Sequence, residues 1–298
     1  WVTGHSYVAY GPLVNGATQV IYEGTPDTPH QGRWWEIVEK HGVTLFYSSP
    51  TAIRVLKKHD IRHLRDHDLS KLAYLFLAGE PLDEPTAQWI TGALGKPVID
   101  NYWQTETGWP VLALMPGVEL KPVKFGSPGL PTPGFDLRVI DESTGARLPP
   151  GTKGVLVIQP PLPPGCMTTV WNDDQRFLSS YFSHFKELVY SSLDWAIQDE
   201  DGYTFILGRT DDVINVAGHR LSTGSMEEVL ASHPAVAECA VIGVADTLKG
   251  ELPLGLVVLK AGVTQDPEAI RQELVAKVRD EIGPVAAFKL VAVVSRLP

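Results

Sequence analysis

The chain has 298 residues, of which 44% are hydrophobic and 20% are charged, so it carries enough apolar material for a globular core. Its length predicts about two or three folding units rather than one. A net charge of −10 argues against a nucleic-acid-binding protein, because a protein that reads the phosphate backbone needs a basic surface. The longest apolar stretches, such as residues 252–259, are too short to cross a bilayer.

The ends and the cysteines bear on the context of the protein. The chain starts at Trp1 rather than at a methionine and stops at Pro298, so we expect a fragment of a longer protein. The two cysteines, Cys166 and Cys239, are far apart and lack a Cys-x-x-Cys spacing. We interpret them as free thiols in a reducing compartment and expect the protein to be cytoplasmic.

The first part of the chain, residues 1–120, alternates strand-like and helix-like segments. The pattern predicts helices at residues 33–41 and 84–94 and after Pro50, and strands at residues 18–22, 44–47, 72–77 and 97–102. Such alternation indicates an α/β part with a parallel sheet covered by helices. Ligands of such sheets gather at the carboxyl ends of the strands.

The amino-acid composition changes after about residue 121, where Gly and Pro become frequent. Short alternating strands at residues 135–140, 155–159 and 203–207 predict a β-rich part over residues 121–209, built as a small antiparallel sheet or barrel. The last part, residues 210–298, is an α+β module small enough to move as a body. It has predicted helices at residues 225–233 and 267–282 and predicted strands at residues 236–244, 253–260 and 290–294.

The strongest local signal is the segment DNYWQTETG, residues 100–108, which begins at the end of a predicted strand. Its aromatic rings can stack on a flat base, the Thr105 hydroxyl can bond to phosphate oxygens, and Glu106 can hold Mg²⁺. One glutamate is enough, since Mg²⁺ is usually bound by one or two carboxylates together with phosphate oxygens. A polar turn beside a packed tryptophan explains the same residues equally well.

Two further segments carry weaker signals. Gly79, Glu80 and Pro81 follow the predicted strand 72–77, and a glycine there lets the backbone approach a ligand closely, although strand–glycine turns are common. The segment YTFILGRTDDVINVAGHRL, residues 203–221, gathers arginines and aspartates around apolar residues. Arginines suit phosphate and ribose contacts because the guanidinium forms a bidentate fork, and a salt-bridged surface hairpin is the alternative.

Taken together, these segments resemble the adenylate-forming enzymes, in particular the acetyl- and propionyl-CoA synthetase branch. The resemblance covers essentially the whole chain, and YWQTETG (residues 102–108) and GRTDDVINVAGHRL (residues 208–221) are its most specific motifs. It implies part of a large lobe with a parallel sheet, helices and a small β-barrel-like subdomain, followed by a small mobile α+β C-terminal domain. It also implies a ligase in which a short carboxylate attacks ATP, in the presence of Mg²⁺, and coenzyme A then displaces AMP.

The resemblance assigns roles by motif. The nucleotide would be bound by Gly79, Glu80, Pro81, Asp100, Asn101, Tyr102, Trp103, Gln104, Thr105, Asp194, Arg209 and Arg220. Within this set, Asp194 and Arg209 would contact the ribose. Thr105 and Arg220 of the set, together with Glu106, would be catalytic. Glu106 would bind Mg²⁺ and His233 a structural metal, and Asp211 would be the hinge of the domain rotation. The residues expected to meet coenzyme A are Thr3, Asp27, Ala217, Gly218 and Arg279.

The acyl pocket implied by the resemblance consists of Val2, Thr3, Ala78 and Trp103. Trp103 should close the pocket, and Ala78 stands where acetate-selective relatives tend to carry valine. Replacing Val by Ala makes room for about one methylene, worth about 0.8 kcal/mol and a discrimination of roughly 10–200-fold. We therefore predict that propionate is preferred and acetate accepted, with the carboxylate, ATP and coenzyme A as partners and no nucleic acid or membrane.

The chain also departs from the family pattern. Leu193 precedes Asp194 where relatives have Gly or Thr, and Asp27 stands where many have Asn. The chain contains no Ser/Thr/Gly-rich phosphate loop, and the catalytic lysine of the family is expected a few residues past Pro298, so this fragment alone should be inactive. A ligase domain of a larger multifunctional protein, a non-catalytic nucleotide-binding module and an unrelated αβ binding protein stay open as alternatives.

Overall fold

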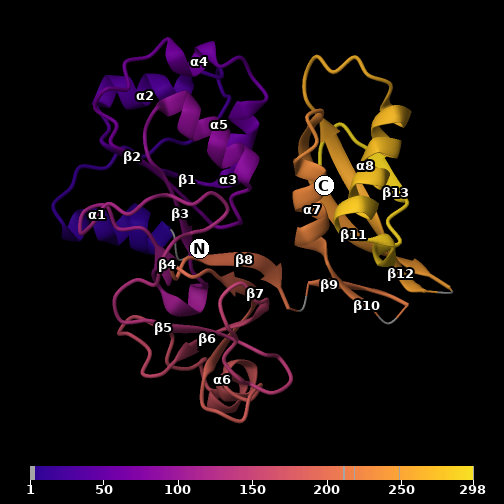
Figure 1. Cartoon of the computed structure of the whole chain (residues 1–298). Coiled ribbons are helices and arrows are strands. Elements are labelled where there is room, and N and C mark those ends of the chain that lie inside the picture. Colours follow the sequence, from indigo (N-terminus) through magenta and orange to yellow (C-terminus); the bar gives the residue numbers. More distant parts are fainter. Residues whose placement is uncertain (1–3, 211, 218, 248, 298) are drawn as a thin grey trace. The chain divides into compact units, whose positions relative to one another are not determined.

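The computed structural model describes residues 4–297 except 211, 218 and 248, and at Val8 and Arg220 the backbone only. The chain divides into two compact units (Figure 1). Unit 1 consists of the chain up to Leu56 and of Asp60–Ile206, and unit 2 consists of Lys57–His59 and of the chain from Leu207 onward. Among the described residues, no helix is both long enough and apolar enough to span a bilayer.

The first sheet of unit 1 is parallel at its core. Strands β1 (Leu45–Ser48), β2 (Tyr74–Ala78) and β3 (Val98–Tyr102) run parallel in this order, and β4 (Leu112–Ala113) pairs with β3 antiparallel. Helices α2 (Arg33–His41), α3 (Pro50–Lys57) and α5 (Glu84–Leu94) cover it (Figure 1), and their buried side chains share one core with those of β2 and β3. Because the carboxyl ends of parallel strands meet at one edge, the turn after β2 lies beside the segment after β3.

The second sheet of unit 1 is open and antiparallel. It contains, in this order, β5 (Asp136–Ile140), β6 (Gly154–Gln159), β7 (Tyr190–Gln198) and β8 (Thr204–Arg209). The expected β-barrel-like form is therefore wrong for the described strands, which follow an open path and are too few to close around a core of side chains. Helix α6 (Asp174–Tyr181) contributes Tyr181 to the core of this sheet.

Unit 2 is an α+β body around a five-stranded sheet. The strand order is β10 (His219–Ser222), β9 (Val213–Val216), β12 (Gly250–Leu259) and β11 (Val236–Asp246), and β13 (Leu290–Val293) pairs with β12. Helices α7 (Thr223–Ala231) and α8 (Pro267–Glu281) bury Met226, Leu230 and Leu274 against the sheet (Figure 1). The remaining helices of the described chain are short: η1 (Gly4–Tyr10), α1 (Gly11–Val14), α4 (Arg62–Arg65), η2 (Thr105–Thr107) and η3 (Pro284–Ala286).

Most elements agree with the sequence predictions, and α2 and α5 have the predicted bounds. The strand predicted at residues 18–22 is wrong, because this segment is irregular and pairs with no other strand of the described chain. Its β-branched residues Val20 and Ile21 are 44% and 73% exposed, so no core holds the segment extended. Helix α6 and strand β7 were not predicted, and the division at residues 120 and 209 stays a prediction.

Candidate functional site

Asp194 lies on β7 but is held by two residues from the end of β3. The Tyr102 hydroxyl donates a hydrogen bond to Asp194 Oδ2 at 2.5 Å, and Gln104 Nε2 donates to the same oxygen at 2.9 Å. Asp194 is 6% exposed, and charge-assisted bonds of this kind offset the cost of keeping a carboxylate out of water. Burial raises the pKa of Tyr102 well above its ordinary value, so the phenol keeps its proton and remains the donor.

A β-bulge shapes the chain around Asp194. Ser191 pairs with Val157 and Trp195 with Val155, so residues 192–194 of β7 stand opposite the single residue Leu156. Leu193 has a φ of 60°, a left-handed conformation that costs a leucine about 1–2 kcal/mol. At this bulge the chain therefore carries a strained leucine in a backbone conformation that suits glycine.

Gln104 acts as an internal clamp. Its Nε2 donates to the Ser192 carbonyl at 2.6 Å as well as to Asp194, and its Oε1 accepts from the Tyr190 hydroxyl at 2.9 Å. A glutamine amide has two N–H donors, and both are engaged here. Direct contact between Gln104 and a nucleotide would therefore have to use the remaining lone pair of Oε1, and the geometry favours a role in holding Asp194.

Glu106 lies on the single turn η2 and is fixed through both its backbone and its side chain. Its carbonyl accepts from Met167 N at 2.6 Å, and its Oε1 accepts from the Tyr181 hydroxyl at 2.5 Å. Gly108 ends the turn with a φ of 73°, and a Cβ there would lie 2.5 Å from the Gly165 carbonyl oxygen, so a larger residue does not fit. Thr105 is exposed beside Glu106 on the same turn.

The turn after β2, residues 79–81, is organised by Arg54 of α3. Its Nη1 pairs with Glu80 Oε2, its Nε with Asp83 Oδ2, and its Nη2 donates to the Pro81 carbonyl, each at 2.9 Å. Glu80 Oε1 also accepts from Thr51 N at 2.7 Å. Gly79 has a φ of 102°, and no atom lies within 4 Å of the position of a Cβ there, so the backbone is open to an approaching ligand.

Asp100 and Asn101 are polar residues of β3 that pair with Leu77 and Ala78, the last two residues of β2 before this turn. Burial raises the pKa of Asp100 to about 7, although the carboxylate accepts backbone hydrogen bonds from Asn101 and Leu82. Asn101 is 4% exposed, and its Nδ2 donates to the Leu77 carbonyl at 3.2 Å. Within the described chain Asn101 Oδ1 is a buried acceptor without a partner, which is a feature of sites that receive a ligand or an ordered water.

Aromatic rings surround Trp103. Tyr7 meets Trp103 edge to face at 5.3 Å and stacks on Tyr47 at 4.6 Å. Burial raises the pKa of Tyr7 to about 12, and among described groups the buried Tyr47 hydroxyl has no hydrogen-bond partner. Ala78 is 4% exposed and pairs with Asn101, two residues before Trp103. The other predicted pocket residues, Val2 and Thr3, lie outside the described residues.

Unit 2 carries the remaining predicted residues. Arg209 is the last residue of β8 and is exposed. It belongs to unit 2 and Asp194 to unit 1, so the expectation that both contact the ribose stays a prediction. Ala217 follows β9 at the tip of the β9–β10 hairpin with a φ of 49°. Asp211, Gly218 and the Arg220 side chain lie outside the described residues. Asp27, predicted to meet coenzyme A from unit 1, accepts from Thr25 Oγ1 at 2.9 Å in an irregular segment.

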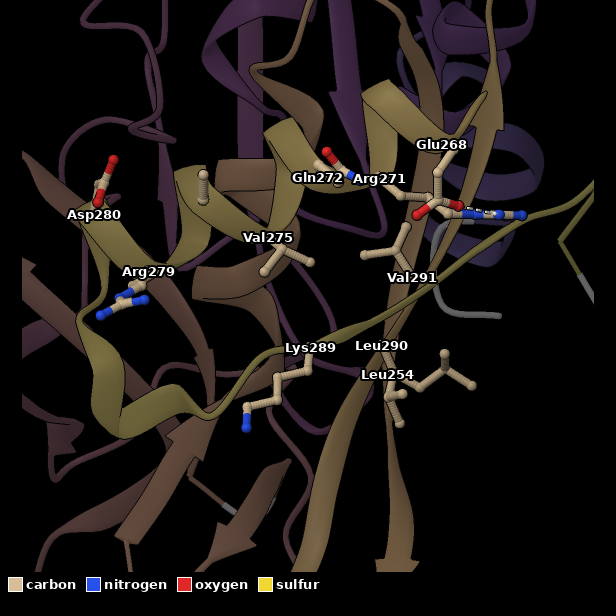
Figure 2. Close-up of a pocket in the computed structure, with 11 residues that line it drawn as sticks. Leu254, Glu268, Arg271, Gln272, Val275, Arg279, Asp280, Lys289, Leu290 and Val291 are labelled. Carbon is tan, nitrogen blue, oxygen red and sulfur yellow. Dashed lines mark hydrogen bonds and ion pairs between the residues drawn. The ribbon is translucent and has the colours of Figure 1, made fainter. Parts of the chain in front are cut away.

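Arg279 lines an open groove of about 910 Å³ between α8 and strands β12 and β13 (Figure 2). Four further charged side chains also line the groove: Arg271, Lys289, Glu268 and Asp280. Leu254, Val275 and Leu290 line it with apolar side chains. Arg271 is paired with Glu268 at 2.9 Å. The groove therefore combines three cationic and two acidic side chains with an apolar lining, and its cationic groups can bond to phosphate.

The two predicted metal ligands differ in their surroundings. His233 Nδ1 accepts from Ala235 N at 3.2 Å, and Nε2 lies 2.9 Å from Glu273 Oε2, so both ring nitrogens are engaged in protein contacts. This arrangement fits a structural histidine better than a metal ligand. Glu106 suits Mg²⁺ because Tyr181 engages only one of its carboxylate oxygens. The described residues contain no cluster of three or more His, Cys, Asp or Glu that could hold a metal without further ligands.

Several residues of this site escaped the sequence predictions: Arg54, Tyr181, Tyr190 and Ser192. Tyr181 lies 75 residues from Glu106, and Tyr190 lies 86 residues from Gln104. Neither tyrosine belongs to a local motif, so only the side-chain contacts with Glu106 and Gln104 in the three-dimensional structure reveal them. Arg54 had one weak signal, since it follows the helix start at Pro50 by about one turn and can face the strand edge.

Comparison with known proteins gives consistent matches. A family model described as AMP-binding enzyme matches residues 1–169, and a model described as AMP-binding enzyme C-terminal domain matches residues 225–298. The chain is 52% identical over 302 aligned positions to a propionate–CoA ligase of Salmonella typhimurium, covering 100% of this chain and 48% of that protein. An acetyl-coenzyme A synthetase of Pyrobaculum aerophilum is 48% identical, with 100% of this chain and 44% of that protein covered.

A solved structure shares the fold. It is an anthranilate CoA ligase in complex with anthranoyl-AMP, with a TM-score of 0.78 and 25% sequence identity over 95% of this chain and 52% of that chain. The chain thus spans about half the length of the proteins it matches.

Proposed function

Because the chain belongs to the AMP-binding enzyme family, we propose that the protein is an AMP-forming ligase that joins a short carboxylic acid to coenzyme A. The preferred acid is propionate, and acetate is accepted. The observation that carries this proposal is the junction of Tyr102, Gln104 and Asp194, which brings a buried carboxylate from the second sheet to the carboxyl ends of the parallel strands. Relatives named propionate–CoA ligase and acetyl-coenzyme A synthetase support it.

In this proposal the nucleotide lies along the strand edge. The backbone of residues 79–81 faces the adenine, and Asp100 and Asn101 Oδ1 offer acceptors to its exocyclic amine. Asp194 accepts from the ribose hydroxyls, with Arg209 as its predicted partner. Thr105 and Arg220 bond to the phosphates, where charge neutralisation supports in-line attack by the carboxylate.

Glu106 is the proposed Mg²⁺ ligand, and the bound ion would neutralise charge on the phosphate oxygens. The protein's own part in this step is orientation. Tyr181 holds one carboxylate oxygen of Glu106, and Met167 holds its backbone. A carboxylate fixed in this way needs little reorganisation when the metal–nucleotide complex binds.

The second half-reaction needs unit 2. Coenzyme A would meet Thr3 and Asp27 of unit 1 and Ala217, Gly218 and Arg279 of unit 2, while Asp211 acts as the hinge. Arg279 supports this part of the proposal because it lines a groove that holds two further cationic side chains and an apolar lining. The thiol then attacks the acyl-adenylate carbonyl and AMP leaves. His233 has no part in this chemistry, and cytoplasmic location accords with a ligase that uses ATP and coenzyme A.

The acid is selected by Trp103 and Ala78, together with Val2 and Thr3. The Trp103 ring is braced by Tyr7, which in turn stacks on Tyr47, so the wall of the pocket is stiff. A stiff wall limits chain length, and the small Ala78 side chain leaves space for one more methylene than valine would.

The test is product analysis on the intact protein with ATP, Mg²⁺ and coenzyme A, supplied with acetate, propionate or butyrate. We expect the CoA thioester, AMP and pyrophosphate in equal amounts, with kcat/KM highest for propionate and lowest for butyrate. Formation of ADP and phosphate would contradict an AMP-forming ligase. Stabilisation by AMP without any thioester would favour a non-catalytic nucleotide-binding module.

A further inference from the structure

The two carboxylates of the site, Glu106 and Asp194, are joined by an unbroken set of side-chain contacts within unit 1. From Asp194 the contacts run through Gln104 to the Tyr190 hydroxyl, each at 2.9 Å. The Tyr190 ring stacks on Tyr181 with centroids 5.2 Å apart and an interplanar angle of 8°. The Tyr181 hydroxyl then donates to Glu106 Oε1 at 2.5 Å.

Tyr181 stands where it can fix the direction of the Glu106 side chain. The backbone of Glu106 is already held by Met167 and by the closely packed turn at Gly108, so the remaining freedom lies in the side-chain torsions. A hydrogen bond to one carboxylate oxygen removes most of that freedom. It also leaves the second oxygen to a cation, as Mg²⁺ bound mainly by phosphate oxygens requires.

The position of Tyr181 is itself set by packing. It is the last residue of α6, its ring lies 5.7 Å from that of Phe177, and it is stacked on the buried Tyr190 ring. It also lines a pocket of about 310 Å³ with Trp171 and Arg176. The stack on Tyr190, together with the contact with Phe177, therefore sets the plane of the phenol and the direction of its hydroxyl.

We propose that Tyr181 is a positioning residue for the metal–nucleotide complex: its hydroxyl holds Glu106 in the orientation that binds Mg²⁺, and its stack on Tyr190 ties that orientation to the Asp194 clamp. This inference deepens the proposed function and rests on it, because it takes Glu106 as the Mg²⁺ ligand. Groups that orient a metal ligand in this way typically contribute 10–100-fold to metal affinity or activity.

The decisive variant is Tyr181→Phe in the intact protein, which keeps both ring contacts and removes only the hydroxyl. We expect the Mg²⁺ concentration for half-maximal activity to rise roughly tenfold, while the KM for propionate stays unchanged. A second readout does not depend on turnover. The additional increase in melting temperature that Mg²⁺ gives in the presence of ATP should largely disappear in the variant.

The matched control is Tyr203→Phe, because Tyr203 donates a partly buried 2.6 Å hydrogen bond to the Pro122 carbonyl in the same unit, away from Glu106. This variant should keep the wild-type Mg²⁺ dependence. In a Glu106→Gln background, Tyr181→Phe should add no further loss. A wild-type Mg²⁺ half-saturation in Tyr181→Phe, or an equal shift in Tyr203→Phe, would overturn the inference and leave the proposed function standing. A wild-type protein that forms no thioester would instead overturn the proposed function, and this inference with it.

Discussion

The Tyr102 hydroxyl lies 2.5 Å from Asp194 Oδ2, although 92 residues separate the two in the sequence. This one bond joins the parallel sheet of unit 1 to its antiparallel sheet at the point where both carry functional side chains. Gln104 makes a second bond to the same oxygen at 2.9 Å. The Asp194 carboxylate is therefore part of the junction between the two sheets as well as a candidate ligand group.

Replacing Tyr102 by Phe should destabilise this junction. A hydrogen bond to a charged group contributes about 1.5–3 kcal/mol, and Asp194 would stay buried with one donor fewer. We expect a fall of several degrees in the melting temperature of the intact protein and weaker AMP binding. The control is Tyr22→Phe, which removes the surface hydrogen bond from Tyr22 to the Thr28 carbonyl. Equal losses in both variants would contradict a special role of the Tyr102–Asp194 bond.

Leu193 offers a test of the bulge. Its left-handed backbone suits glycine, so Leu193→Gly should keep or slightly raise the free energy of unfolding despite the lost side chain. Leu193→Val should lower it by about 2 kcal/mol, because a β-branched residue fits this conformation poorly. Thermal unfolding of both variants checks the order. If Leu193→Gly were the less stable of the two, the result would contradict backbone strain at Leu193.

The raised pKa of Asp100 predicts a pH dependence with a definite sign. Its pKa is about 7 in the folded protein, against about 3.9 for an unfolded aspartate. The folded state therefore holds a proton that the unfolded chain releases at lower pH. The contribution of this carboxyl is fully present below about pH 4 and is lost as the pH rises through about 7.

The Asp100→Asn variant replaces the titrating carboxyl by an amide that does not titrate, and it keeps the shape of the side chain. Relative to the wild type, the variant should become more stable as the pH is raised from about 4 to about 7, with no further change above that. Melting temperatures of both proteins measured across this range give the difference directly, because the other titrating groups cancel. A difference that stays constant with pH would show that Asp100 titrates normally.

The acyl pocket is tested by Ala78→Val. The two added methyl groups should occupy the space of one methylene, so the kcat/KM ratio of propionate to acetate should fall, within the roughly 10–200-fold that one methylene allows. Ala113→Val is the matched control, since Ala78 and Ala113 pair with Asn101 from opposite sides and both are buried. An unchanged ratio in Ala78→Val would remove Ala78 from the pocket.

Local patterns accounted for the elements but only for part of the site. Helices α2 and α5 begin and end as predicted, because their start and stop signals lie within the helices and their flanking residues. The segment at residues 18–22 shows the limit of this reasoning: its β-branched residues favour a strand, yet a strand forms only where a partner is available.

In the candidate site, too, some residues could be recognised from the local sequence and others could not. Residues 100–106 and 79–81 are recognisable because each group is contiguous and lies at the carboxyl end of a strand or directly after it. Tyr181, Tyr190 and Arg54 act through contacts between distant segments. Nothing in the neighbourhood of the two tyrosines marks them, and Arg54 has only the weak signal of the helix start at Pro50. The clamp function of Gln104 likewise became apparent only from the partners of its amide, since its motif had suggested a ligand contact.

The most direct test of the whole account is ATP–pyrophosphate exchange in the intact protein, measured without coenzyme A and with acetate, propionate or butyrate. This reaction reports only the first step, for which Glu106 and Asp194 are proposed to be needed. The account predicts carboxylate-dependent exchange that is fastest with propionate and is strongly reduced by Asp194→Asn and by Glu106→Gln. Exchange that no carboxylate stimulates, or that both variants retain at the wild-type rate, would contradict it.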